Sequence, residues 1–288
     1  MEMNVSNEHA EFDAPRGSVG LSPVAILPIL FVVAVVIFLF IFGNPVNFKD
    51  DKNLSGLSVA FSSVESKDLH PTSPIGMIYM GGFIVPFLVF FMLTVIVFSL
   101  ERLFILNKAK GNGNLDKFVI KIRSLLKQNK IQEALEECDH QRGTVGNVVR
   151  EGLATYKALS NDNTLNKEQK MVALNKAIEE ATTLEMPMLE KNMMILSTLG
   201  TVATLVALLG TVIGMIRAFF ALGSGGGTPD AAALSIGISE ALINTALGIG
   251  TSAIAIILYN FFTSKIDSMT YRIDEISMSI QQSFAEFN

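Results

Sequence analysis

Four long apolar stretches dominate the sequence, and such stretches are typical of membrane-spanning helices. They cover residues 24–42, 75–100, 193–222 and 234–263. A helix needs about 20 apolar residues to cross the hydrocarbon core of a bilayer. The first two stretches have no charged residue, and the last two have one each, Arg217 and Glu240. We therefore expect an all-α polytopic membrane protein with four transmembrane helices.

The first stretch is expected to be a retained span rather than a cleaved signal peptide. A signal peptide begins with a basic region and ends at a small-residue cleavage site. Residues 1–23 hold one basic residue, Arg16, against four acidic residues, and Gly43–Pro45 is a poor cleavage site.

Between the second and third spans, the sequence predicts a helical domain over residues 101–192. Apolar residues recur there at helical spacing, and glycines at 111, 113, 143 and 146 predict breaks. From Leu165 to Leu222 the helical pattern has no stop signal, so we expect one long helix, kinked at Pro187. Residues 264–288 are expected to form a second helix outside the membrane, which packs against that long helix.

The lysines and arginines orient the chain across the membrane. Fifteen of the 22 fall in residues 101–192, whereas the hairpin at 223–233 has none. Loops rich in basic residues stay in the cytoplasm. This rule places residues 101–192 and both terminal segments, 1–23 and 264–288, in the cytoplasm, and the loops at 43–74 and 223–233 on the other side.

The sequence shows little sign of an enzyme or of a cofactor site. The three histidines are far apart and lack nearby cysteines or carboxylates at metal-ligand spacing. No glycine-rich loop precedes a lysine in the manner of a phosphate-binding loop. The lone cysteine, Cys138, has no partner for an internal disulfide, and no basic patch indicates nucleic-acid binding. We expect no catalytic residue, cofactor or metal.

Small and hydroxyl residues form stripes along the last two spans. Helices in a bilayer associate through small residues and shared hydrogen bonds, so an interface within one subunit explains such stripes. Their length and their hydroxyls also fit a face that binds water or a carboxyl group. The stripes comprise Gly200, Ala203, Ala207, Gly210 and Gly214 beside Ser197, Thr201, Thr204, Leu208 and Thr211, and then Gly237, Ala241, Thr245, Gly248, Ser252 and Ala255, flanked by Asn244 and Thr251.

The two charged residues of these spans are predicted to lie near the same depth. Arg217 is ten residues before the hairpin centre at Gly227, and Glu240 is thirteen after it. Because a lone charge in a membrane is costly, we expect an ion pair, which either locks the hairpin or serves ion entry. Thr211 and Thr245 lie ~8–9 Å deeper at ~1.5 Å per residue and form a second polar level.

Two motifs in these spans resemble the ExbB/TolQ proton channel family, the larger subunits of proton-driven motors in the inner membrane of Gram-negative bacteria. The first is LLGTVIGM at Leu208–Met215, and the second is SEALINTALG at Ser239–Gly248, followed by Tyr259-Asn260. The family's patterns are similar to LxGTVxGI, IxEALxxTAxG and YN. The likeness is close in the last two spans, nearest to ExbB, and extends loosely over residues 75–288.

The resemblance implies a ring-forming subunit, usually of a pentamer, that energises outer-membrane transport. The ring surrounds the single spans of an ExbD/TolR-type partner, whose membrane aspartate takes up and releases protons, and a TonB-type protein is a further candidate partner. By motif position, Thr211 and Thr245 match the family's lining threonines, and Glu240 matches its membrane glutamate. From the stripes, we expect Asn244 and Ser252 to line the lumen as well. Packing against the partner helix is expected at Thr204, Ala207, Leu208, Gly214, Ala241 and Gly248.

Several positions depart from the family pattern. Thr204 and Ile254 stand where the family often has proline, Ala207 where it often has glycine, and Arg217 where it often has histidine or asparagine. The missing prolines predict straighter spans. The span at 24–42 is an addition to the family's usual three.

Other functions fit parts of the same pattern. A TolQ-like motor subunit for envelope maintenance is the nearest alternative, because Ala218–Gly223 resembles TolQ. A membrane scaffold without proton flux fits if the stripes serve assembly alone. A self-contained transporter is expected to show internal repeats and broken helices, which this sequence lacks. The threonine level has no carboxylate of its own, which favours a motor subunit whose partner supplies one.

Overall fold

The computed structural model describes residues 22–48, 72–224 and 231–287, and the regular elements in these ranges are helices. The predicted all-α fold is therefore confirmed. Most of the predicted segment 1–23, most of the loop at 43–74 and the middle of the hairpin at 223–233 lie outside the described residues.

Four helical stretches are long and apolar enough to cross a membrane, as the sequence predicts. They are Pro23–Phe42, Gly82–Ala109, Met193–Gly223 and Ala231–Phe287. The first comprises α1 (Pro23–Val36) and a π-helical turn (Ile37–Phe42), and a 3-10 turn (Pro45–Asn47) follows it. The second comprises a 3-10 turn (Gly82–Ile84) and α4 (Val85–Ala109), after the short α3 (Pro74–Tyr79). The third is α9 (Met193–Ser224), and the fourth is α10 (Ala231–Phe287).

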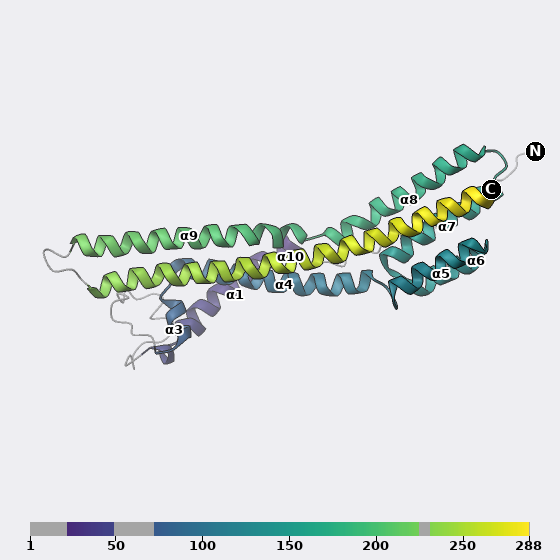
Figure 1. The fold of residues 1–288 in the computed structure, drawn as a ribbon. Coiled ribbons are helices and arrows are strands. Elements are labelled where there is room, and N and C mark those ends of the chain that lie inside the picture. The colour runs from purple at the N-terminus through teal and green to yellow at the C-terminus, as the bar shows by residue number, and fades with distance from the viewer. Residues whose placement is uncertain (1–21, 49–71, 225–230, 288) are drawn as a thin grey trace, which may run out of the picture.

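The residues between the second and third spans fold into an extramembrane bundle. It contains α5 (Leu115–Lys127), α6 (Ile131–Gln141), α7 (Gly143–Asn161) and α8 (Lys167–Glu190). These helices pack around the far ends of α4 and α10 (Figure 1). Their shared core includes Ile122, Leu153, Leu174, Ile273 and Ile280. Breaks occur at residues 110–114 and at Arg142, as expected, but Gly146 lies inside α7 and does not end a helix.

The predicted continuous helix from Leu165 to Leu222 is broken in the structure. α8 ends at Glu190 and α9 begins at Met193, because Asn192 adopts a φ of 61°. Pro187, where a kink was predicted, lies inside α8, one turn before the break.

Buried polar groups of α4 fix this break. Asn192 donates its side-chain amide to both carboxylate oxygens of Glu101, at 3.0 and 2.9 Å. Arg102 is fully buried and donates to the carbonyls of Met188 and Leu189 at 3.4 Å. A cation at the C-terminal end of a helix complements the helix dipole and the unpaired carbonyls there.

The continuous helix of the molecule is instead α10, which has 57 residues and runs from the membrane pair through the bundle (Figure 1). The helix predicted at 264–288 is the C-terminal part of α10, continuous with the fourth span up to Phe287. Between Thr251 and Phe287 the sequence contains no glycine or proline. Nothing in that stretch interrupts the backbone hydrogen bonds, and one apolar face continues into the bundle core.

Candidate functional site

The small residues of α9 and α10 pack against each other within one chain. A Cβ added to Gly214 would lie 2.8 Å from the Gly237 carbonyl oxygen and 3.0 Å from the Cβ of Ala241. A Cβ added to Gly248 would lie still closer to the Cβ of Ala207. In the single chain these residues pack between α9 and α10, and the contact of Ala207, Gly214, Ala241 and Gly248 with a partner helix stays a prediction. Their surfaces are already buried by the close approach of the two backbones.

Two other predicted packing residues do face outward. Leu208 is 58% exposed, and Thr204 is exposed one turn before it. Both are exposed in the single chain, and another helix can reach them there.

Thr211 and Thr245 meet where α9 and α10 cross the same depth. Their hydroxyl oxygens lie 2.5 Å apart. Because each hydroxyl has one proton, the one that does not donate to the other threonine donates to a carbonyl of its own helix, Thr245 to Ala241 at 3.0 Å or Thr211 to Ala207 at 3.1 Å. Both residues are half-buried, so one side of the pair remains open. Each hydroxyl rotates and can redirect its proton toward a new acceptor on that side.

An apolar groove begins at this threonine pair and follows α9 toward the hairpin. It is open to the outside, and every lining residue comes from α9: Thr211, Val212, Met215, Ile216, Phe219 and Phe220. The groove therefore places the threonine hydroxyls beside an apolar surface on which an apolar helix can pack.

Arg217 and Glu240 form the ion pair that the residue count predicts. One guanidinium nitrogen of Arg217 donates to both Glu240 carboxylate oxygens, at 2.7 and 2.9 Å. The Glu240 side chain is 5% exposed and that of Arg217 is 53% exposed. The guanidinium also lies 5.8 Å from the centre of the Phe83 ring, within range of a cation–π contact. The carboxylate is thus buried inside the subunit, while the arginine reaches outward.

The turn before α4 covers this carboxylate, a contact that the sequence pattern does not predict. Gly82 has a φ of +74°, and a Cβ on it would lie 3.1 Å from the Glu240 carboxyl carbon. Asn244 donates its side-chain amide to the Gly81 carbonyl at 3.0 Å. Paired glycines are a turn signal, so Gly81-Gly82 near the start of an apolar stretch indicate a turn. They do not indicate which residues the turn contacts.

Asn244 and Ser252 make their contacts inside the single chain, and their lining of a lumen stays a prediction. Asn244 is fully buried beside Gly210 and the Gly81 turn. Ser252 is buried and donates to the Gly200 carbonyl of α9. Glu240, predicted to line the same path, is also buried by Gly82 and Arg217. Of the five predicted lining residues, Thr211 and Thr245 keep an open side.

Comparison with known proteins identifies the part of the chain that carries these residues. Residues 141–275, from the end of α6 to Glu275 of α10, match the MotA/TolQ/ExbB proton channel family. These residues are similar to the members of that family. The family segment contains the threonine pair, the ion pair and the groove, whereas α1 and α4 precede it.

Individual relatives of the MotA/TolQ/ExbB family support the same assignment. The chain is 34% identical over 113 residues to the biopolymer transport protein ExbB of Xanthomonas campestris, covering 39% of this chain and 44% of the relative. It is 30% identical over 154 residues to a putative ExbB homologue of Methanothermobacter thermautotrophicus, covering 53% of this chain and 50% of the relative. An ExbB of Helicobacter pylori is 39% identical over 82 residues, 28% of this chain and 56% of the relative. The chain therefore spans about half the length of the curated relatives it matches.

Proposed function

We propose that this chain is a ring-forming subunit of an ExbB-type motor in the bacterial inner membrane, driven by the proton-motive force. The ring surrounds the spans of an ExbD-type partner and energises outer-membrane transport. The observation that carries the proposal is the Thr211–Thr245 hydroxyl pair, half-open on the α9–α10 surface of a proton channel family segment.

The chemistry of proton transfer explains why a partner is needed. A proton path requires an ionisable group close to hydroxyls or water and shielded from lipid. At the depth of the threonine pair, α9 and α10 supply no carboxylate, and Glu240 is already bound by Arg217. A partner span with a membrane aspartate supplies the missing group, and the groove from Thr211 to Phe220 accommodates its apolar neighbours.

The charge distribution supports the orientation of this subunit. The extramembrane bundle belongs to the basic segment 101–192, which the positive-inside rule places in the cytoplasm. The hairpin between α9 and α10, and with it the Arg217–Glu240 pair, then lies toward the periplasm.

Removing the threonine hydroxyls tests the proposal. Thr211→Val and Thr245→Val keep the side-chain shape and remove the proton donors. We expect proton flux through liposomes that contain the chain and its aspartate-bearing partner to fall about tenfold, the kinetic effect of losing one hydrogen bond of about 1.4 kcal/mol.

Thr251→Val is the matched control, because Thr251 is buried and its hydroxyl donates to the Leu247 carbonyl of its own helix at 2.8 Å. We expect Thr251→Val to leave the flux unchanged and all three variants to assemble normally. Normal flux in both Thr211→Val and Thr245→Val would contradict the proton-lining role and favour a scaffold. The TolQ-like alternative is indicated by a different result for the wild-type chain. In that case the wild type conducts protons and supports envelope maintenance but does not support outer-membrane uptake.

A further inference from the structure

The outward face of α5 is basic and includes an exposed apolar side chain. Within Leu115–Lys127, α5 has four basic residues and one acidic residue. Ile120 is 67% exposed. Lys117 lies three residues before Ile120, Lys121 follows it directly and Lys127 lies two turns after it, and all three are exposed on the same side of the helix. Ile120 also lines a hollow between α5 and α10, together with Lys127 and Ser279, and a side chain of another protein segment can enter it.

The outward face of α8 has the opposite charge. From Glu179 to Glu190 the helix carries four glutamates and no lysine or arginine. Leu184 lies in the middle of this stretch and is 62% exposed. Glu179 and Glu180 are exposed one turn before it. α8 thus presents an apolar side chain among acids, the complement of the α5 face.

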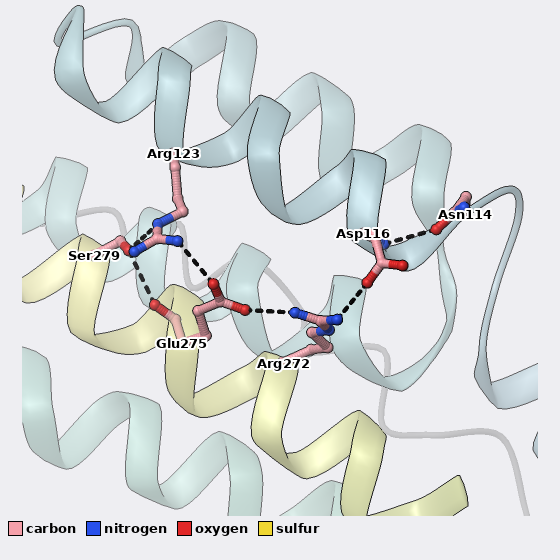
Figure 2. Close-up of polar contacts among 6 residues, drawn as sticks. All are labelled: Asn114, Asp116, Arg123, Arg272, Glu275 and Ser279. Atoms are coloured by element: carbon pink, nitrogen blue, oxygen red, sulfur yellow. Dashed lines mark hydrogen bonds and ion pairs between the residues drawn. The ribbon is translucent and has the colours of Figure 1, made fainter.

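Contacts to α10 show where the outward face of α5 lies along the length of α10. Arg272 of α10 pairs with Asp116, at the start of α5, and Arg123 of α5 donates to Glu275 of α10 at 2.7 Å (Figure 2). Ile120 lies midway between Asp116 and Arg123. It is therefore level with residues 272–275 of α10.

The α8 face lies at the same height. On that side, the Thr270 hydroxyl contacts the Met186 sulfur at 3.7 Å, and Lys167 donates to the Ala285 carbonyl at 2.6 Å. Leu184 is two residues from Met186 on the way to Lys167, so it is also level with about residue 272 of α10 at 1.5 Å per residue.

The two faces lie on either side of α10, with α8 on one side and α5 on the other (Figure 1). A chain therefore cannot bring its own α8 onto its own α5. A second copy at the same height in the membrane can do so. Two different, complementary patches make a head-to-tail contact, and such contacts repeat around an axis until they close into a ring.

We propose that α8 of one copy docks on α5 of the next copy in the ring. Leu184 of one copy packs beside Ile120 of its neighbour, while Glu179 faces Lys117. Lys121 and Glu180 flank this contact and pair with Glu137 and Lys176 of their own chains. This contact rests on the proposed ring-forming function and names the surface outside the membrane through which the ring closes.

Cysteine cross-linking of the full chain in membranes tests the contact directly. We expect Ile120→Cys together with Leu184→Cys to give, on oxidation, a ladder of cross-linked species that stops at the ring size. The single variants Ile120→Cys and Leu184→Cys are the controls, and we expect no ladder from either. A cross-linked dimer from a single variant would show a two-fold contact and overturn the head-to-tail arrangement.

Charge reversal gives a second readout that does not depend on cysteine geometry. We expect Lys117→Glu and Glu179→Lys each to cause loss of rings measured by native mass spectrometry, and the double variant to restore them. Glu136→Lys, an exposed reversal on α6, is the matched control and should leave rings intact.

The outcomes separate this contact from the proposed function. Rings of normal mass that neither cross-link through residues 120 and 184 nor respond to charge reversal would overturn the α8–α5 contact and leave the motor proposal standing. A wild-type chain that is monomeric in membranes would overturn both.

Discussion

Cys138 shows how burial decides the chemistry of a single residue. Its thiol lies in the core of the extramembrane bundle, and burial, with a smaller contribution from Asp139, raises its pKa to about 12. The nearby Arg150 opposes this rise, and Glu137 adds slightly to it. Because only the thiolate reacts with electrophiles, the native thiol should be inert near neutral pH.

The expected result is that Cys138 resists maleimide labelling at pH 7.5 in the folded protein and labels fully in detergent that unfolds it. A raised pKa means that the thiolate fraction grows only as the pH approaches 12, so labelling of the folded protein should stay slow through pH 9. Ile120→Cys, an exposed position on α5, is the positive control. Equal labelling rates at residues 120 and 138 in the folded protein would contradict this prediction.

The sequence predicted the depth of single residues better than the direction in which they point. Arg217–Glu240 and the level of Thr211 and Thr245 follow from counting residues along two antiparallel helices, which requires only the rise per residue. The burial of Asn244 depends on the turn at Gly81, which lies 163 residues earlier in the chain. No local pattern around Asn244 contains that contact.

At the scale of helices, the pairing of α9 and α10 depends on glycines that face the partner helix. A Cβ at Gly248 would meet the Cβ of Ala207 and the backbone of Ala203, whereas a Cβ at Gly250 would have open space. The same substitution at these two neighbouring positions therefore separates interhelical packing from intrinsic helix propensity.

We expect Gly248→Val to destabilise the protein by about 1–3 kcal/mol, the usual cost of overpacking a close contact. Gly250→Val should have little effect on the stability of a single chain. Thermal unfolding followed by circular dichroism in detergent measures the difference. Equal melting temperatures for the two variants would show that α9 and α10 do not rely on this close approach.

The break between α8 and α9 also belongs to the scale of helices. Asparagine tolerates a positive φ better than most residues, but this tolerance alone did not mark residue 192 as a helix end. The deciding groups, Glu101 and Arg102, lie on α4 and satisfy the polar atoms that the break exposes. The sequence pattern from Leu165 to Leu222 is helical throughout, so the break became visible only with its tertiary partners in place.

At the scale of the whole molecule, α10 is the mechanical link between the membrane pair and the extramembrane bundle. It packs along α9 in the membrane and then contributes Ile273, Ile280 and Phe284 to the bundle core. The four spans could be predicted because long apolar stretches are a strong signal. The continuity of α10 was missed because an apolar helix and an amphipathic helix were treated as separate units.

Ser264→Pro tests whether that continuity matters. Proline removes the backbone N–H of residue 264 and clashes with the carbonyl of Asn260, at a cost of about 3 kcal/mol in a helix interior. Ser264 is exposed, so the substitution leaves the cores on both sides intact, and Ser264→Ala is the matched control.

Hydrogen exchange should accelerate at the amides around 264 and stay slow at 273–284, where the bundle core holds the helix. If α10 transmits force between membrane and bundle, Ser264→Pro will still form rings but will lose energised uptake. Uptake equal to that of Ser264→Ala would show that the two halves work without a rigid connection.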